Sequence, residues 1–382
     1  MEMDRKNLNL LIFSSYGGGH WRAAEAIRDA FRIRYREVQV VEVINFMDYA
    51  HPLLQLGTHD LYLRLLRRFP HVYRYAFQKT HDSSLITFQR WVTMIGFQRL
   101  LKLLEETKPF AVVSTHPFPA GAMSTFKWYG LIEVPTITVI TDHTDHHYWI
   151  HPCTDQYLVG SDYVKQKLLS AGLKEEQVAV TGIPIRPQFS LFHSGDELRR
   201  KYGFKPGVPT LLIMGGSWGL IDDGVEVLRL LDQLPYPLQV FFVCGRNQEL
   251  WEKLTREQTK LKNQVLVTQY IDEVDQLMAA SDMIITKPGG VTTTEAIALE
   301  VPMLLYKPLP GQEEENAQFL LHAGVAQLAA DARDLAEKVQ VLLQDPDRLR
   351  TMRENESRFP FKRSAFAASD IIYSFRPRMD QS

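Results

Sequence analysis

The sequence predicts an α/β protein built from two doubly wound, Rossmann-like domains, each with a parallel sheet. Short aliphatic or β-branched runs alternate with longer helical patterns, which indicates βαβ units. The strand-like runs are too many for one ordinary domain. A proline-rich segment, 181–189, separates two series of them, and a chain of 382 residues has room for two or three domains.

The expected strands follow from these runs in chain order. In the first half they are Leu8–Phe13, Val38–Ile44, Phe110–Ser114, Pro135–Ile140, Gln156–Val159 and Val178–Thr181. In the second half they are Thr210–Met214, Gln239–Val243, Val265–Thr268, Met283–Thr286, Pro302–Tyr306 and a weaker Val325–Leu328. We therefore expect one domain over 1–187 and a second over 188–361, followed by a helical pattern over 359–375.

Composition excludes several classes of protein. Apolar residues make up 45% and charged residues 23% of the chain, as in globular proteins, and the formal net charge of −2 argues against a dedicated nucleic-acid binder. Cys153 and Cys244 form no CxxC pair, which fits a reducing cytosol and no cysteine zinc site. No stretch has the length of a signal-peptide core or a membrane-spanning helix, so any membrane contact is expected at the surface.

A glycine loop, SSYGGGHW over 14–21, follows the first expected strand. No glycine lies three residues beyond Gly19 and no Gly-Lys-Ser/Thr follows, so neither a nicotinamide cofactor nor a P-loop is expected. The glycines let a ligand approach the backbone, and a helix start behind them favours anionic groups. His20 stands at this helix start, either facing the substrate or as a helix cap without chemistry.

A second glycine loop, MGGSWG over 214–219, follows the first strand of the second half. The amides around Gly216 and the hydroxyl of Ser217 are expected to cradle a phosphate at a helix start. The alternative is a plain turn between strand and helix.

A third loop, ITKPGGVTTTEA over 285–296, opens a helix at Gly289 and Gly290. Thr292 in its first turn can bind phosphate, and the carboxylate of Glu295 can accept hydrogen bonds from ribose hydroxyls. The same spacing also fits a capping box between Thr292 and Glu295. Two phosphate-capable helix starts in one domain predict a diphosphate ligand.

A Gln-Glu pair follows the next strand, in PLPGQEEENA over 308–317. Gln312 and Glu313 offer a donor and an acceptor suited to vicinal hydroxyls of a sugar. An acidic helix start, favoured by the helix dipole, is the alternative interpretation.

Five motifs occur in order along the chain: GGGH (17–20), TDxxxHxxW (141–149), TGIPIRPQF (181–189), KPGGxTxxE (287–295) and PGQExEN (310–316). Together they resemble the monogalactosyldiacylglycerol synthase and processive diacylglycerol β-glucosyltransferase family, over about residues 8–343. The resemblance implies a GT-B fold, two Rossmann-like domains with an interdomain cleft, and an inverting glycosyltransferase without a bound metal. It also implies that the C-terminal helix, 362–382, packs back on the first domain.

The resemblance also implies roles for matching residues. His20 would be the general base on the acceptor hydroxyl. Arg186 would reach the nucleotide, the backbone of Ile271 would hold uracil, and Glu295 would bind ribose. The implied nucleotide and donor contacts are Gly19, Arg186, Gly216, Ser217, Ile271, Gly289, Gly290, Thr292, Glu295, Gln312 and Glu313.

The stretch TDHTDHHYWIH over 141–151 is rich in histidine and aspartate. Its spacing is neither HExxH nor DxD, and neighbouring strand residues point to opposite faces, so a metal site is the weaker interpretation. We expect instead an acceptor site lining the cleft, with Asp142, His146 and Trp149 matching the family.

Residues 53–90 are amphipathic, basic and aromatic. A basic amphipathic helix can lie on an anionic leaflet, although an ordinary solvated face on a core-packed helix fits the same pattern. The expected membrane contacts are Arg64, Arg67, Arg68, Phe69 and Tyr73. The protein is then expected to be cytoplasmic and peripheral on the inner leaflet.

These observations predict transfer of a hexose from UDP-glucose or UDP-galactose, glucose being favoured, to diacylglycerol or a glycosyldiacylglycerol. Inversion would give a β-linked glycolipid, with no cofactor and no nucleic-acid partner. The alternatives are a UDP-GlcNAc transferase acting on a lipid-linked peptidoglycan intermediate, a UDP-sugar epimerase, and a non-catalytic UDP-sugar-binding protein.

Overall fold

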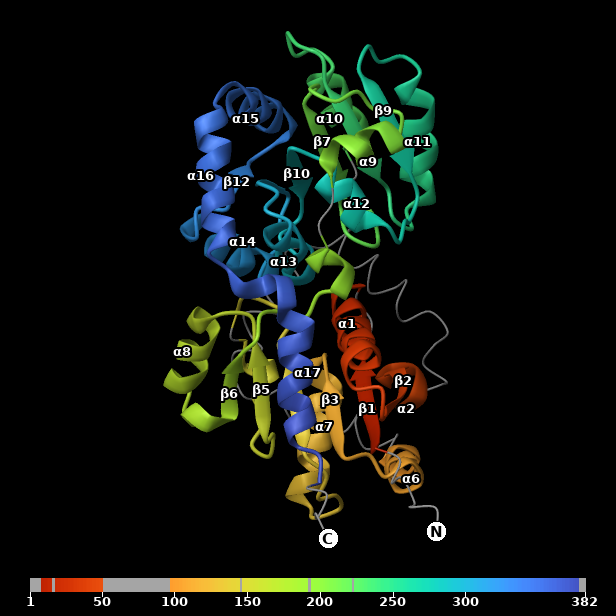
Figure 1. Cartoon of the computed structure of the whole chain (residues 1–382), viewed down its shortest axis with the longest axis vertical. Coiled ribbons are helices and arrows are strands. Elements are labelled where there is room, and N and C mark those ends of the chain that lie inside the picture. The colour runs from red at the N-terminus through yellow and green to blue at the C-terminus, as the bar shows by residue number, and fades with distance from the viewer. Residues whose placement is uncertain are drawn as a thin grey trace. The chain divides into compact units, whose positions relative to one another are not determined.

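The computed structural model describes residues 8–15, 18–50, 97–144, 146–191, 194–221 and 223–377. Contacts within the chain divide it into two compact units. Unit 1 comprises Met1–Pro187, Pro310–Gln312 and Arg363–Ser382, and unit 2 comprises Gln188–Leu309 and Glu313–Lys362. Each unit is an α/β structure with one parallel sheet covered by helices (Figure 1).

The sheet of unit 1 has the strand order β2-β1-β3-β4-β5-β6. Its strands are β1 (Leu8–Ser14), β2 (Val38–Asn45), β3 (Ala111–Ser114), β4 (Thr136–Val139), β5 (Gln156–Val159) and β6 (Val178–Val180). Its helices are α1 (Gly18–Arg34), α2 (Phe46–Ala50), α6 (Phe97–Thr107), α7 (Pro117–Trp128), α8 (Asp162–Ser170) and α17 (Ser364–Ser374), with short 3₁₀ turns η3 (His147–Trp149) and η4 (Glu175–Gln177).

The sheet of unit 2 has the order β12-β11-β10-β7-β8-β9. Its strands are β7 (Thr210–Met214), β8 (Gln239–Val243), β9 (Gln264–Thr268), β10 (Met283–Thr286), β11 (Met303–Tyr306) and β12 (Ala326–Ala329). The helices after Pro187 are α9 (Gly195–Lys201), α10 (Gly224–Leu231), α11 (Gln248–Gln258), α12 (Val274–Ala279), α13 (Gly290–Ala298), α14 (Gln312–His322), α15 (Ala332–Gln344) and α16 (Pro346–Ser357), with 3₁₀ turns η5 (Pro187–Ser190) and η6 (Pro360–Arg363).

The predicted α/β class and all twelve predicted strands are confirmed. Small differences occur at strand ends. β4 begins at Thr136 and β11 at Met303, so the prolines that were expected to open these strands lie outside them. Proline has no N–H to donate to a ladder, which explains why the strands begin one residue later.

The interior strands bury their side chains on both faces, as parallel strands covered by helices must. All five residues of β7 and of β8 are buried, for example. In unit 1, β1 lies between β2 and β3, and its buried residues face helices on either side. This arrangement brings the carboxyl ends of the central strands to one edge of each sheet, where ligands bind in doubly wound folds.

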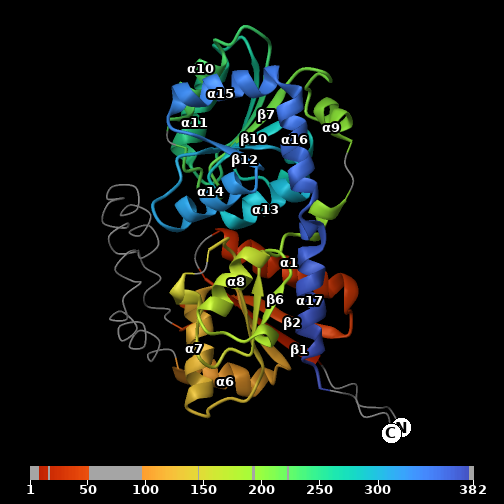
Figure 2. The same cartoon turned by 90° about the vertical axis from the view of Figure 1, so that its left-hand side faces the viewer.

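The C-terminal helix α17 packs against α1, and Figure 2 shows the two helices together. Ala368 and Ile372 join the core cluster that contains Ile27 of α1. The Tyr35 ring stacks on Tyr373 at 3.9 Å between centroids, beyond the end of α1. The helix itself begins at Ser364, because a 3₁₀ turn occupies Pro360–Arg363 at the start of the helical pattern.

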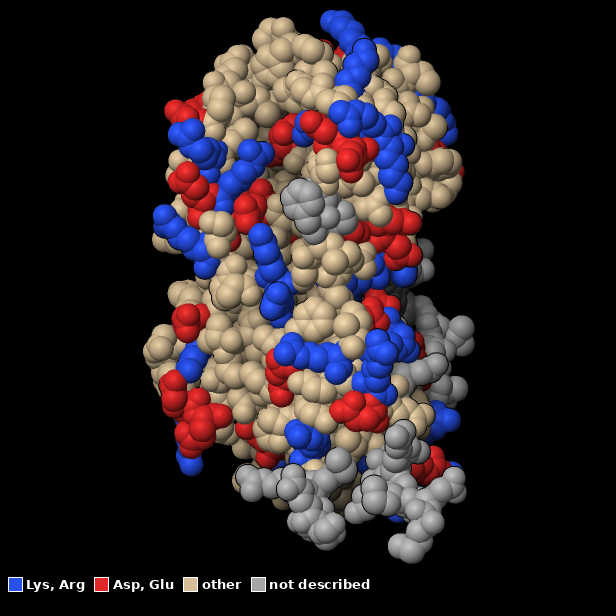
Figure 3. All heavy atoms as spheres, in the orientation of Figure 1, with Lys and Arg blue, Asp and Glu red and all other residues tan. Residues whose placement is uncertain are grey.

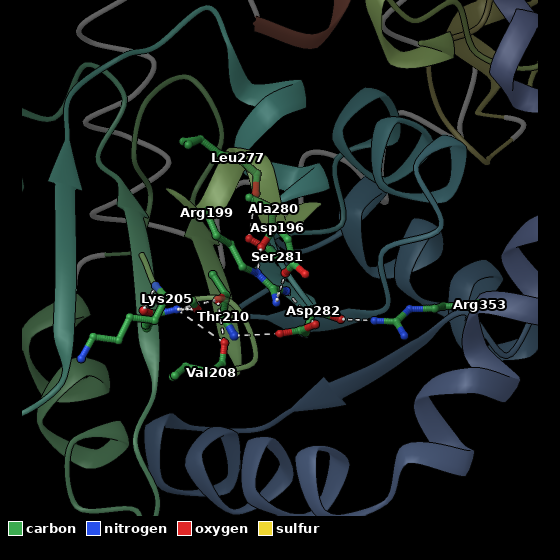
Figure 4. Close-up of polar contacts among 11 residues, drawn as sticks. Asp196, Arg199, Lys205, Val208, Thr210, Leu277, Ala280, Ser281, Asp282 and Arg353 are labelled. Atoms are coloured by element: carbon green, nitrogen blue, oxygen red, sulfur yellow. Dashed lines mark hydrogen bonds and ion pairs between the residues drawn. The ribbon is translucent and has the colours of Figure 1, made fainter. Parts of the chain in front are cut away.

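A polar network anchors the amino ends of the strands in unit 2 (Figure 4). Asp282 accepts hydrogen bonds from Arg199 Nη2 at 2.9 Å and from the Thr210 backbone N–H at 2.8 Å. Its carbonyl oxygen accepts from Arg353 Nη2 at 3.2 Å. These contacts tie α9, β7 and α16 to β10 at the end of the sheet opposite to the glycine loops, so we assign them a structural role.

The surface in Figure 3 shows basic and acidic side chains interspersed over the visible face, with no broad area of one sign. No helix in the described ranges is both long enough and apolar enough to cross a bilayer.

Candidate active site

His20 is the third residue of α1 and is held from two neighbouring loops. Its ring Nδ1 lies 2.7 Å from the hydroxyl of Thr141, which follows β4. Its backbone carbonyl accepts a hydrogen bond from the hydroxyl of Thr115, at the end of β3, at 3.0 Å. His20 therefore lies inside the helix and is held by the carboxyl-end loops, which does not fit the alternative of an N-terminal cap.

Two more rings surround His20. The ring of His116 packs edge-on against it at 4.7 Å between centroids, and that of Trp149 lies 5.9 Å away. His116 is itself fixed, because its side chain accepts from the Phe118 backbone N–H and caps α7.

Burial sets the charge state of both histidines. It lowers the pKa of His20 to about 4, against the opposing effect of a hydrogen bond from the ring to the Thr115 backbone. Burial, and then the proximity of His20, lowers the pKa of His116 well below its usual value. Both imidazoles are therefore neutral near pH 7, the state in which an imidazole can take up a proton.

The residues expected at the acceptor site follow β4 closely. Asp142 and His146 are buried, and His146 caps η3 by accepting from the Tyr148 backbone N–H at 3.3 Å. Trp149 is also buried and belongs to a hydrophobic cluster with Ile140 and others. Since its indole packs in a core, Trp149 contributes a fixed surface beside His20, and direct contact with an acceptor stays a prediction.

His151 and His143, in the same stretch, are held differently. His151 Nε2 donates to the Pro117 carbonyl at 3.2 Å. His143 is fully buried, which lowers its pKa to about 3. Among the residues that the structure describes, no three His, Cys, Asp or Glu side chains gather as a metal site would require.

The second glycine loop differs from its prediction. Gly216 and Ser217 lie in a tight turn, and α10 begins only at Gly224, so they are not at a helix start. The turn is locked against the loop after β8: Arg246 N donates to the Ser217 carbonyl at 2.9 Å, and a Cβ on Gly219 would collide with a backbone carbonyl there. The expected helix start at this loop is therefore wrong, because tertiary packing extends the turn.

The loop after β8 adds a cation that the sequence did not single out. The guanidinium of Arg246 lies 5.1 Å from the ring of Trp218 and 5.6 Å from that of Tyr270. These residues come from the loops after β7, β8 and β9, three adjacent strands. Ile271, the expected uracil contact, is half-buried next to Tyr270 and precedes α12.

The third loop forms the helix start that was predicted. Gly289 is the N-cap of α13 and Gly290 its first residue. Thr292 lies within the helix, so it is not the N-cap of a capping box with Glu295. The hydroxyls of Thr293 and Thr294 bond back to helix carbonyls, and Thr292 is the least buried of the three threonines.

The start of α14 is tied to the third loop. Lys287, buried at the end of β10, lies 3.6 Å from Glu313 Oε2, which also accepts from the Leu309 backbone N–H at 2.6 Å. Asn316 Nδ2 donates to the Pro288 carbonyl at 3.0 Å. Lys287 was absent from the predicted site residues, although it opens the KPGG motif. Its position identifies it as the partner of the predicted sugar ligand Glu313.

The remaining predicted residues lie in unit 1 or outside the described ranges. Gly19 is exposed in the first turn of α1, and Arg186 is buried in unit 1. Gln312 is the first residue of α14 and is grouped with unit 1, where its Nε2 donates to a carboxylate oxygen of Asp142. Their contacts with a nucleotide or sugar stay predictions. The expected membrane residues Arg64, Arg67, Arg68, Phe69 and Tyr73 lie outside the described residues.

Two family models of glycosyltransferases match successive parts of the chain, and similar enzymes align with nearly all of it. The family model "Monogalactosyldiacylglycerol (MGDG) synthase" matches residues 20–185, and the model "Glycosyl transferases group 1" matches 204–359. The processive diacylglycerol beta-glucosyltransferase of Bacillus cereus strain AH187 is 35% identical over 353 residues, 91% of this chain and 89% of its own. The Bacillus pumilus enzyme of the same name is 34% identical over 359 residues, 93% and 92% of the two chains.

Solved structures show the same fold at low sequence identity. Acinetobacter baumannii MurG superposes with a TM-score of 0.61 at 14% identity, covering 96% of this chain and 99% of its own. S. aureus MnaA, solved with UDP, has a TM-score of 0.61 at 15% identity and covers 94% of each chain. These neighbours confirm the expected GT-B fold.

The motifs, the two parallel sheets and the extent of the matched sequence lead to one conclusion. The chain is a glycosyltransferase and belongs to the family of the processive diacylglycerol beta-glucosyltransferases.

Proposed function

We propose that this enzyme transfers a hexose, glucose in the first place, from a UDP-sugar to diacylglycerol or a glycosyldiacylglycerol, with inversion, to give a β-linked glycolipid. One observation carries the proposal: His20 is a neutral imidazole held by its ring and its backbone at the carboxyl edge of the unit 1 sheet. The 35% identity to beta-glucosyltransferases that act on diacylglycerol by name supports the acceptor and favours glucose over galactose.

Unit 2 offers groups for the donor at the ends of β10 and β11. The amino end of α13, at Gly289 and Gly290, presents backbone N–H groups that suit a diphosphate. The buried carboxylate of Glu295 suits ribose hydroxyls, and Glu313, fixed by Lys287, suits hydroxyls of the sugar. Because helix N–H groups and cationic side chains can stabilise the departing diphosphate, we propose transfer without a bound metal.

The proposed chemistry is a single displacement. The acceptor hydroxyl gives its proton to His20 Nε2 while its oxygen attacks the anomeric carbon of the donor. The bond from that carbon to the diphosphate oxygen breaks, and UDP leaves with both electrons from the opposite face. Configuration at the anomeric carbon therefore inverts, and His20 later releases the proton to solvent.

The experiment combines purified protein with phosphatidylglycerol liposomes that contain diacylglycerol, and with UDP-glucose, UDP-galactose or UDP-GlcNAc. UDP release and lipid products are followed by chromatography, with EDTA present in one arm. We expect lipid-dependent UDP release and a new glucolipid, unchanged by EDTA. Two further arms replace diacylglycerol by a lipid-linked peptidoglycan intermediate or omit lipid. Product only with that intermediate and UDP-GlcNAc, epimerisation of the UDP-sugar without lipid, or nucleotide binding without turnover would each refute the proposal.

The base is tested in the same assay with His20→Gln, which we expect to lose at least about a hundredfold in kcat, as for removal of a general base. His322→Gln is the matched control, because His322 is exposed at the end of α14. Equal activity of the two variants would remove His20 from the mechanism.

We further propose that the enzyme binds the anionic inner leaflet through Arg64, Arg67, Arg68, Phe69 and Tyr73. The interleaved basic and aromatic pattern supports this contact. Replacing the three arginines by glutamine is expected to abolish sedimentation with phosphatidylglycerol vesicles at low salt. Unchanged sedimentation would contradict it.

A further inference from the structure

We propose that Thr141 is the positioning residue for His20: its hydroxyl oxygen accepts a hydrogen bond from Nδ1–H and thereby presents the Nε2 lone pair to the acceptor hydroxyl. This inference rests on the proposed role of His20 as the base. Thr141 is buried directly after β4, and its Oγ1 lies 2.7 Å from His20 Nδ1. The pair joins residues that are 121 positions apart in the chain.

The reason for a dedicated partner is the chemistry of imidazole. A neutral imidazole carries its hydrogen on one ring nitrogen and can take up a proton only on the other. The hydrogen bond made by one nitrogen decides which tautomer is present. Since Thr141 engages Nδ1, the nitrogen left for a substrate is Nε2, and it acts as a base only while Nδ1 carries the hydrogen.

A hydroxyl suits this task differently from a carboxylate. A carboxylate beside Nδ1 would stabilise the imidazolium and raise the pKa of the histidine. The Thr141 hydroxyl orients the ring without adding a negative charge. His20 then stays neutral in its half-buried position, in agreement with the lowered pKa of its ring.

The surrounding contacts restrict the ring plane, and the backbone carbonyl of Thr115 also accepts a hydrogen bond from the ring of His20. Thr115 fixes the backbone of His20, and the rings of His116 and Trp149 pack beside it. His116 accepts a backbone hydrogen bond on Nδ1 and is neutral. Apart from the Thr115 carbonyl these contacts are steric, so removing the Thr141 hydroxyl is expected to shift the tautomer with little change in ring position.

The variant Thr141→Val keeps the side-chain shape and removes the hydroxyl, whereas Thr141→Ser keeps the hydroxyl. We expect kcat to fall tenfold to hundredfold in Thr141→Val with the KM for UDP-glucose within twofold, and to return to within threefold of wild type in Thr141→Ser. Thr125→Val is the matched control, because Thr125 loses only a hydrogen bond to the Gly121 carbonyl within α7.

The deciding measurement is the tautomer of His20, read from ¹⁵N chemical shifts of the full chain labelled with [¹⁵N]histidine and assigned with His20→Gln. We expect the Nδ1–H form in the wild type and in Thr141→Ser, and a mixture or the Nε2–H form in Thr141→Val. The Nε2–H form in the wild type overturns the proposal, and this reading does not depend on the folding of any Thr141 variant. A fall in kcat with an unchanged tautomer also overturns it.

The same spectra separate this proposal from the proposed function. If His20→Gln retains full transferase activity while the wild type shows the Nδ1–H tautomer governed by Thr141, the base assignment fails and the positioning contact stands. If His20→Gln is inactive and the tautomer ignores Thr141, the proposed function stands and this inference fails.

Discussion

The acid side of the pH profile gives the most specific prediction. The perturbation is a fall in pH from 7.5 to 5.5. A histidine with the ordinary pKa of about 6.5 would be only about 9% neutral at pH 5.5, whereas one with a pKa of about 4 stays about 97% neutral. If His20 is the base, kcat/KM therefore changes little across this range, where an ordinary histidine would lose about tenfold.

The same pKa shift has a consequence for stability. The pKa of His20 is lower in the folded state than in the unfolded state, so the unfolded chain binds the proton first as the pH falls from about 6.5 to about 4. Stability is therefore complete above pH 6.5 and is lost through that window, by at most about 3 kcal/mol for this residue. Activity must be measured above pH 5, with folding followed by tryptophan fluorescence.

The assay measures kcat/KM for UDP-glucose on diacylglycerol vesicles from pH 5 to 8 at constant ionic strength, with each sample re-assayed at pH 7.5. We expect a flat acid limb and full recovery. A reversible fall with a midpoint between pH 6 and 7, together with an NMR titration of His20 at the same midpoint, would refute the reasoning.

Three further predictions concern unit 2. Glu295→Gln is expected to raise the KM for UDP-glucose tenfold to hundredfold, because a hydrogen bond to a charged group contributes about 1.5–3 kcal/mol. An unchanged KM would show that Glu295 does not bind the donor. Gly219→Ala is expected to lower the free energy of unfolding in urea by at least about 1 kcal/mol more than Gly216→Ala. Both glycines have positive φ, but only at Gly219 would a Cβ collide with backbone atoms. Equal losses of stability in the two variants would contradict this account. Burial raises the pKa of Glu356 well above its usual value, and both its carboxyl oxygens are buried without a hydrogen-bond partner among the described residues. Glu356→Gln should therefore stabilise the protein at pH 7 and lose that gain in stability toward pH 4.5. A gain in stability that grows as the pH falls would contradict this account.

The strands could be predicted because parallel strands buried on both faces have continuous aliphatic sequences. The run Leu211, Leu212 and Ile213 is one example, and all three side chains are fully buried. The order of elements then places the glycine loops at the carboxyl edges without any knowledge of packing. His20 and the α13 start at Gly289 were found for this reason.

The contacts between those loops could not be predicted from one sequence. Thr141 meets His20 because β1 and β4, far apart in the chain, lie in one sheet with β3 between them. Lys287 meets Glu313 because β10 and β11 are neighbours in the other sheet. The interpretation of Ser217 as part of a helix start failed for the same reason, since its turn is fixed by packing against the loop after β8.

The most direct test of the central claim is the linkage of the product. UDP-[1-¹³C]glucose is incubated with the enzyme and diacylglycerol vesicles, and the extracted lipid is analysed by NMR at the anomeric carbon. The account predicts label in a glucosyldiacylglycerol with the β configuration, and none with His20→Gln. An α-linked product, or an unlabelled lipid fraction in the presence of active, folded enzyme, would contradict it.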